Sequence, residues 1–193
     1  METPRERFIR LLRSTGTPGI EDLISWLDSP GSDWFRAPAS TKYHGAYEGG
    51  LVDHSLAVYD ELERLYAAYE GRVLAGCITT PQSRILVALL HDLCKVNTYK
   101  SVIKSRKNEF GTWEKYQGWE HQEDYKFGGH GSKSVFLISQ YIKLHPEEAA
   151  AINCHMGPWE NGKNQELSAV YNVSPLAWML HAADEAATFI IQK

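Results

Sequence analysis

The sequence predicts an all-α protein with one short β excursion. Most of the 193 residues fall into segments whose apolar residues recur at the period of an α-helix. Residues 98–129 instead alternate polar and apolar side chains and are rich in β-branched and aromatic types, which indicates a β-hairpin. The length suits one domain. We therefore expect a single domain, residues 1–193, with N-terminal helices in 1–33 and a hairpin insertion at 98–129.

Two short helices are predicted at the N-terminus. The first is amphipathic and covers Arg5–Arg13. Thr17 and Pro18 fit an N-cap followed by a proline at the first helical position, which predicts a second helix ending at Leu27. The following stretch, 33–50, contains several glycines, prolines and aromatic residues. We expect it to be an ordered loop over the core, because its aromatic side chains are too apolar for solvent.

The remaining helices follow from apolar periodicity and from proline in the first turn. They are predicted at 51–69, 85–96, 132–144, 146–156 and from 175 to the C-terminus. Within 98–129, a turn is expected at 108–111. The sequence does not decide whether a third short strand is present. The body should therefore contain at least six helices.

The segment 85–96, ILVALLHDLCKV, is apolar around most of its circumference but carries His91, Asp92 and Lys95. An interior helix tolerates such groups only where they are paired, because isolated buried charge is strongly unfavourable. Imidazole and carboxylate are natural ligands of a divalent cation. Taken alone, however, a His-Asp pair satisfied by hydrogen bonds is the more common explanation.

Further histidines and carboxylates fall on or beside the other predicted core helices. These residues are His54, His130, His155 and Asp184. Separate hydrogen-bond partners for so many buried groups are implausible, and convergence on one or two metal ions satisfies all of them together. The set therefore favours a metal centre, and a purely structural helical domain would leave these buried polar groups to chance.

The same residues carry a resemblance to a known family. The order His54, His91-Asp92 and Asp184 resembles the metal-binding signature of the HD-domain phosphohydrolases, an all-α superfamily that hydrolyses phosphate esters. From about Phe35 onward, the blocks APAS, YHGAYEGGLVDHS, HDLCK, GHGSKS and HMG resemble those of phage- and bacterium-encoded HD proteins. The block AYEGGLVDHS is also similar to one in the HD module of 3′→5′ exoribonucleases. The resemblance implies an HD-type helical bundle with a metal site.

The resemblance further implies roles for individual residues. His54, His91, Asp92 and Asp184 would hold a first metal, and Asp92 would bridge to a second one completed by His130 and His155. Mn²⁺, Fe²⁺, Ni²⁺ or Zn²⁺ suits these ligands, whereas so many histidines argue against Mg²⁺. A bridging water would be acidified enough to attack phosphorus.

Three further side chains are candidates for the substrate site. Lys95 would point its ammonium at a phosphate oxygen, which makes it a catalytic residue together with Asp92; a lysine that extends to the surface is the alternative. His44 would contact substrate or pack beneath Tyr47. His181 would contact substrate or orient Asp184, unless it only packs between helices.

Some residues depart from the family pattern or stay outside the scheme. Ser132 stands where close relatives carry an acid. Cys94 and Cys154 flank the motif residues, but the scheme requires no thiolate ligand. His121 and His145 are expected at the surface.

Charge and composition narrow the function. The net charge of −4 argues against a surface that coats nucleic acid. The leading hypothesis is a metal-dependent phosphohydrolase acting on a nucleotide or a nucleotide-like small molecule, as a monoesterase or a diesterase. A 3′→5′ exonuclease on single-stranded RNA or DNA and a non-catalytic nucleotide-binding HD module are the alternatives. The basic first arm of 98–129 is either a solvated face or a phosphate contact.

Cellular context is inferred from simple features. The three cysteines show no CxxC spacing, which argues against a disulfide framework or a zinc ribbon. The charged amphipathic N-terminus does not fit a signal peptide, and no segment is long enough to span a bilayer. We therefore expect a cytoplasmic protein without a membrane partner, and homo-oligomerisation stays open.

Overall fold

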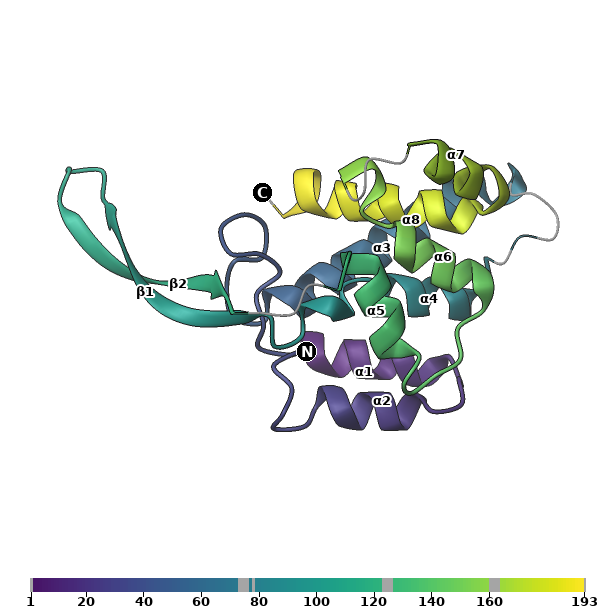
Figure 1. Ribbon diagram of the computed structural model, residues 1–193, viewed down its shortest axis with the longest axis horizontal. Coiled ribbons are helices and arrows are strands. Elements are labelled where there is room, and N and C mark those ends of the chain that lie inside the picture. The colour runs from purple at the N-terminus through teal and green to yellow at the C-terminus, as the bar shows by residue number, and fades with distance from the viewer. Residues whose placement is uncertain (1, 73–76, 78, 123–126, 160–163, 193) are drawn as a thin grey trace.

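Eight α-helices form a body from which one antiparallel hairpin projects, in the residues 2–72, 77, 79–122, 127–159 and 164–192 that the structure describes (Figure 1). This computed structural model confirms the predicted all-α fold with a small hairpin. The helices are α1 Pro4–Ser14, α2 Ile20–Leu27, α3 Gly50–Tyr69, α4 Pro81–Leu90, α5 His130–Ile138, α6 Pro146–Cys154, α7 Asn164–Val173 and α8 Pro175–Ala186. The strands are β1 Tyr99–Lys107 and β2 Trp113–His121.

The N-terminal pair α1 and α2 closes one side of the body, as the purple helices in Figure 1 show. Helix α1 begins with a capping box between Thr3 and Glu6. Helix α2 does not begin at the predicted Thr17-Pro18 cap, because Gly19 precedes it in a left-handed conformation with φ of 86°. A Cβ on Gly19 would lie 2.0 Å from the carbonyl oxygen of Tyr141, so the close approach of these two segments requires glycine.

Helices α3, α4, α6 and α8 pack against one another and form the centre of the body. Helix α3 contacts both α4 and α8, and α6 contacts α4, α5 and α8. The predicted apolar stripe of α3 is buried at Leu51, Val58 and Leu62, and His54 lies on the same face with 1% exposure. The stripe thus packs α3 into the core and brings His54 inside with it.

Helix α4 ends earlier than predicted. It stops at Leu90, and His91 and Asp92 form a turn before the 3₁₀ turn Leu93–Lys95. Distant groups hold this break: the hydroxyl of Ser134 accepts from the backbone N–H of Cys94, and the carboxylate of Asp33 accepts from that of Asn97, whose φ is 55°. The prediction of one continuous helix over 85–96 was therefore wrong, because these partners were not visible in the local sequence.

Several other boundaries differ from the sequence-based prediction. Helix α5 begins at His130 rather than at 132, and α6 ends at Cys154, so His155 follows that helix directly. Helix α7 was not predicted, although Leu167, Val170 and Tyr171 recur in it at helical spacing. After α8 the chain forms a π-helical turn, Ala187–Ile191, instead of continuing as an α-helix. This turn decides where the last residues of the chain lie.

The loop 33–50 connects α2 to α3 and only partly covers the core. Trp34 is fully buried, as expected. Tyr43 and Tyr47 are 77% and 50% exposed, so the expectation that they are buried was wrong. In Figure 1 this loop lies beside the base of the hairpin.

The hairpin extends away from the body as a two-stranded ribbon (Figure 1). Its strands pair in antiparallel register from Tyr99 opposite His121 to Lys107 opposite Trp113. The turn lies where the sequence predicted it, and the Asn108 carboxamide oxygen accepts from two backbone N–H groups within it. Within the described part of the chain the sheet has two strands; residues 123–126 of the predicted insertion lie outside that part.

In the described residues, every helix is too short or too polar to serve as a membrane span. The assignment of the whole chain to one domain stays a prediction.

Candidate metal centre

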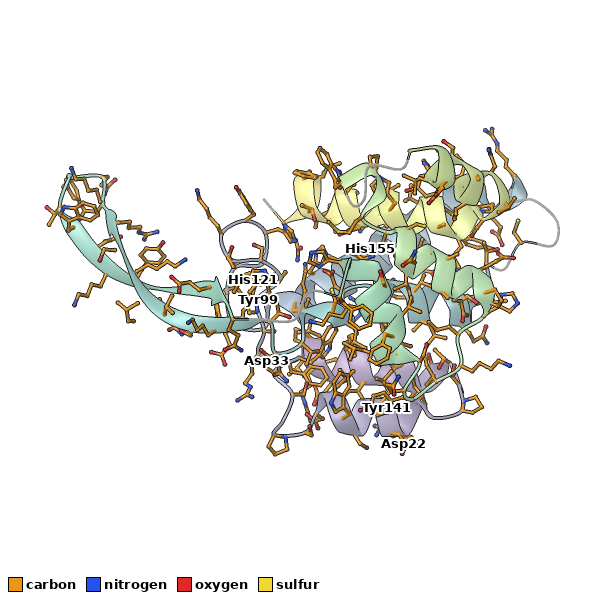
Figure 2. The ribbon with its side chains drawn as sticks, in the orientation of Figure 1. Asp22, Asp33, Tyr99, His121, Tyr141 and His155 are labelled. Carbon is orange, nitrogen blue, oxygen red and sulfur yellow. The ribbon has the colours of Figure 1, made fainter. Side chains whose placement is uncertain are left out.

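Five of the six predicted ligands come together inside the helical body. His54 projects from α3, Asp184 from α8, His91 and Asp92 from the turn after α4, and His155 from the end of α6. The three histidines are at most 1% exposed. Figure 2 labels His155 within the body, between the helices that surround it. Four chain segments therefore supply one cluster.

The distances within the cluster suit a shared cation. His54 Nε2 lies 3.0 Å from Asp184 Oδ1, and His91 Nε2 lies 3.9 Å from the same oxygen. One ligand atom from each of these residues lies within 4.8 Å of the other two. The same limit holds for a second group, formed by His91, Asp92 and His155. The two groups share His91 and lie side by side.

Each of the three histidines has one ring nitrogen fixed by an oxygen acceptor. His91 Nδ1 lies 2.8 Å from the carbonyl oxygen of Ala88, and His155 Nδ1 lies 2.7 Å from that of Ile152. A carbonyl oxygen only accepts, so Nδ1 carries the proton in both rings. In the neutral ring, Nε2 then offers its lone pair to the cluster. This arrangement is typical of histidines that bind metals.

The inward-facing Nε2 atoms lack partners of their own. Nε2 of His91 and Nε2 of His155 are buried and have no hydrogen-bond partner in the structure. A buried polar atom without a partner costs about 1–3 kcal/mol, so such atoms are rare unless they serve a ligand. Their neighbours are carboxylate oxygens, which also accept. A cation between these acceptors would satisfy all of them, so the residues fit a divalent metal.

Asp92 occupies the middle of the cluster. Its Oδ2 lies 3.4 Å from His91 Nε2 and 3.8 Å from His54 Nε2, while its Oδ1 lies 3.6 Å from His155 Nε2. The two oxygens therefore face different histidines, which is the geometry required of a bridging carboxylate. That Asp92 bridges two cations stays a prediction.

Electrostatic interactions within the cluster keep its two carboxylates ionised. Burial raises the pKa of Asp92, but the ammonium of Lys95 and the ring of His91 outweigh this effect and hold the pKa well below its usual range. Burial likewise opposes ionisation of Asp184, whose pKa is nevertheless lowered, chiefly by its hydrogen bond to His54. Burial lowers the pKa of His91, and the charge of Asp92 reverses that effect and raises it. The two carboxylates thus stay ionised and attract cations.

His130 lies beside the cluster instead of completing the His91 and His155 group directly. Its Nδ1 is 3.4 Å from the sulfur of Cys94, and one ligand atom each from Asp92, Cys94 and His130 falls within 4.8 Å. Burial raises the pKa of the Cys94 thiol to about 12, so the sulfur is a neutral thiol at pH 7. Helices α5 and α6 approach each other closely at Gly131. A Cβ there would lie 2.5 Å from the carbonyl oxygen of Asn153, so this contact requires glycine.

Lys95 contacts the centre directly. Its Nζ lies 2.6 Å from Asp92 Oδ2, and its side chain is 13% exposed. Burial lowers the pKa of Lys95, but the neighbouring Asp92 more than compensates, so the pKa is raised and the side chain is an ammonium. Lys95 is therefore not a lysine that merely extends along the surface.

His44 also reaches the centre, from the loop before α3. Its ring centroid lies 4.7 Å from that of His54, and its Nδ1 is buried without a hydrogen-bond partner. Burial, together with the nearby charges of His54 and Lys95, lowers the pKa of His44 to about 4. His44 is thus a neutral ring at pH 7, at the edge of the cluster.

His181 does not contact Asp184 through any hydrogen bond that the structure records. Its Nδ1 lies 2.7 Å from the carbonyl oxygen of His155, and its ring packs against Gly157. His181 thereby supports the turn that carries His155. The expectation that it orients Asp184 is replaced by this contact.

Two residues of the centre were not singled out from the sequence. Gln192 Oε1 lies 2.9 Å from His54 Nδ1, which fixes the third histidine as the carbonyls fix the other two. Gln192 follows the π-helical turn, and no local pattern indicates that it contacts α3. In the sequence, Cys94 lies close to His91 and Asp92. That proximity was the available signal that Cys94 lies near the centre, where it contacts His130.

Comparison with characterised proteins identifies a relative with phosphodiesterase activity. The chain is 31% identical over 126 residues to the dihydroneopterin 2′,3′-cyclic phosphate phosphodiesterase of Methanocaldococcus jannaschii. The match covers 60% of this chain and 41% of the relative, so the chain spans less than half of that protein's length. No protein-family model matches the chain. No solved structure matches it either.

Proposed function

We propose that this protein is a metal-dependent phosphodiesterase of the HD superfamily that acts on a nucleotide or a nucleotide-like small molecule. The observation that carries the proposal is the inward-facing set of three imidazole Nε2 atoms around the carboxylates of Asp92 and Asp184. Such a set has no evident structural purpose, because the buried Nε2 atoms of His91 and His155 have no hydrogen-bond partner. The motif order and the similarity to a phosphodiesterase support the same conclusion.

The proposed ligands follow the two groups of donors. His54, His91, Asp92 and Asp184 would hold one divalent cation. Asp92 and His155 would hold a second, with His130 beside them at the start of α5. When bound, Mn²⁺, Fe²⁺, Ni²⁺ or Zn²⁺ supplies Lewis acidity and a nucleophilic water at neutral pH.

The residues around the cations would bind and neutralise the substrate's phosphate. Lys95 is an ammonium that already lies against the centre, and it can contact a phosphate oxygen without leaving Asp92. His44 is uncharged at pH 7, so it can donate or accept a hydrogen bond without repelling the cations. The low pKa of Asp92 and Asp184 keeps both carboxylates ionised during turnover.

The substrate class rests on the relative. That protein is named for a 2′,3′-cyclic phosphate, a diester whose ring must open at phosphorus. We therefore place cyclic and linear phosphodiesters of nucleotide-like molecules ahead of monoesters.

The test is a substrate panel with the full-length protein. The protein is stripped with a chelator, reloaded with Mn²⁺, Fe²⁺, Ni²⁺ or Zn²⁺, and assayed on 2′,3′-cyclic nucleotides, dihydroneopterin 2′,3′-cyclic phosphate and p-nitrophenyl esters. We expect hydrolysis of diesters that depends on the added metal. His91→Ala should abolish both metal binding and turnover. His121→Ala, at an exposed histidine of the hairpin, is the matched control and should retain both.

Three outcomes would contradict the proposal. Absence of both bound metal and phosphate release across the panel excludes the phosphodiesterase. Metal and nucleotide binding without turnover indicates a binding module instead. Processive release of nucleotides from single-stranded oligonucleotides, with small diesters untouched, indicates an exonuclease.

A further inference from the structure

The register of the hairpin separates its side chains into two chemically different faces. Residues paired directly across an antiparallel ladder point to the same side, and successive residues point to opposite sides. One face therefore carries Tyr99, Ser101, Ile103, Ser105, Lys107, Trp113, Lys115, Gln117, Trp119 and His121. The other carries Lys100, Val102, Lys104, Arg106, Glu114, Tyr116, Gly118 and Glu120. We call the first of these sets the aromatic face.

The aromatic face combines large apolar side chains with positive charge and carries no acidic residue. Ile103 is 70% exposed and Trp113 is 67% exposed, and Phe110 in the adjoining turn is 82% exposed. The ammonium of Lys107 lies 5.6 Å from the centre of the Trp113 ring. Lys115 stands beside Trp113 on the same face. Both acids of the strands, Glu114 and Glu120, point to the opposite side.

On the opposite face, Lys104, Arg106 and Glu114 have partners within the hairpin. Lys104 donates to the carbonyl oxygen of Trp119 at 2.8 Å, and its aliphatic chain covers Gly118. Arg106 pairs with Glu114 at 2.6 Å and lies over the ring of Tyr116. Three charged groups of that face thus have internal partners, whereas the aromatic face exposes Ile103 and Trp113.

A ribbon of two strands is marginally stable in water unless its apolar face is covered. The hairpin projects away from the helical body, so the body does not cover its far half (Figure 1). Exposed Ile103, Phe110 and Trp113 would not be maintained in solvent without a use, since single polar replacements would remove the cost. The aromatic face is thus an interaction surface.

We propose that the aromatic face of the hairpin binds single-stranded nucleic acid. Bases stack on exposed aromatic rings whatever their sequence, while lysines along the same face neutralise the backbone phosphates. The absence of acids on this face removes the repulsion that the net charge of −4 would otherwise exert on a polyanion. A ribbon with rings on one face suits unpaired bases, which a duplex does not expose.

The face begins close to the candidate metal centre. Tyr99, its first residue, follows Lys95 by four positions and is buried against His121 at the base of the hairpin, where Figure 2 labels both. A nucleic-acid strand lying along the aromatic face would therefore have one end near the helical body. Binding by the face does not depend on a metal or on the proposed phosphodiesterase, and it can be measured separately.

The experiment is fluorescence anisotropy of a labelled deoxythymidine dodecamer titrated with the full-length, chelator-treated protein. We expect binding that weakens with salt, with a slope of log K against log salt near −1.4 for two phosphate contacts. Trp113→Ala should weaken binding about tenfold through lost stacking. Lys107→Ala should make the salt slope shallower by about 0.7. A duplex of the same length should bind more weakly than the single strand.

Matched variants on the opposite face serve as controls. Tyr116→Ala removes an aromatic ring, and Lys100→Ala removes a lysine, from the same strands; both should leave affinity within about twofold. Circular dichroism checks that each variant keeps its fold. His91→Ala, which disables the metal centre, should bind the dodecamer as the unchanged protein does. The two proposals therefore fail independently.

Two results would overturn the assignment. One is the lack of anisotropy change with the unchanged protein, or equal losses from both faces. The other is concentration-dependent self-association in sedimentation equilibrium that Trp113→Ala abolishes while oligonucleotide binding is absent. In that case the aromatic face is an interface between copies of this chain.

Discussion

The metal centre and the hairpin place side chains in opposite kinds of unfavourable environment. The centre buries imidazoles, carboxylates and an ammonium inside an apolar body. The hairpin exposes tryptophan, phenylalanine and isoleucine on a ribbon that the body does not cover. Each arrangement costs free energy in isolation. Each region therefore carries groups that a bound partner of the proposed kind would satisfy.

The two regions also differ in how they are held. The centre depends on contacts between α3, α4, α6 and α8, so it exists only in the folded body. The hairpin depends on its own ladder and on the Asn108 turn. Substitutions in the centre should therefore affect folding and function together, whereas substitutions on the aromatic face should affect function alone.

The largest expected effect is that of Asp92→Ala. The change removes the carboxylate between the histidines and leaves the buried Lys95 ammonium without its partner. We expect loss of metal binding and hydrolysis, and a fall in the free energy of unfolding of about 3–5 kcal/mol. Urea unfolding followed by circular dichroism, in chelator, measures the stability.

Lys95→Met in the Asp92→Ala background is the control for that prediction. It removes the unpaired charge, so it should recover much of the lost stability without recovering activity. If Asp92→Ala is as stable as the unchanged protein, the pair does not contribute to the folded state.

A second prediction concerns pH. The pKa of Asp184 is lowered in the folded state, so its contribution to stability is present above the unfolded pKa of about 4 and disappears as pH falls toward the folded value. Asp184→Asn should therefore lose stability relative to the unchanged protein at pH 6, and the difference should shrink by pH 3. Urea unfolding of both proteins at the two pH values measures it. A difference independent of pH would contradict the assignment.

A third, smaller effect is expected at Gln192, which positions His54 through its Nδ1. Gln192→Leu should weaken metal affinity by about ten- to one-hundredfold, because the ring loses its acceptor. Gln192→Glu keeps an acceptor and should retain the affinity. Competition with a colorimetric chelator gives the values, and Gln140→Leu, in the turn after α5, is the control. Equal affinity in the Leu and Glu variants would argue against a positioning role.

The smallest predicted effect is the change in the free energy of unfolding caused by Trp113→Ala in the hairpin. Trp113 is 67% exposed, so Trp113→Ala should change the free energy of unfolding by less than about 0.5 kcal/mol. Trp34 is fully buried, and Trp34→Ala should cost about 3–5 kcal/mol. Thermal and urea unfolding of the two variants compares them directly. Similar losses at the two positions would show that the hairpin is part of the core.

Much of the fold was predictable because helical periodicity and turn chemistry are local. The apolar stripe of α3 and the Asn108 turn were identified from neighbouring residues, and the structure agrees with both. The break after Leu90 was not, because the groups that hold it come from Ser134 and Asp33, far away in the chain. Helix α7 was missed although its pattern was local, since Leu167, Val170 and Tyr171 recur at helical spacing.

The sequence by itself indicated which polar residues lie on or beside the core helices, and it placed the turn of the hairpin. Only the tertiary structure decided that His54, His91, His155 and the two carboxylates share one cluster, that Lys95 lies on Asp92, and that Cys94 stands between Asp92 and His130. Gln192 reaches His54 across 138 positions of sequence. The physical reason is range: a helical period depends on residues three or four apart, whereas a metal centre depends on how whole helices pack.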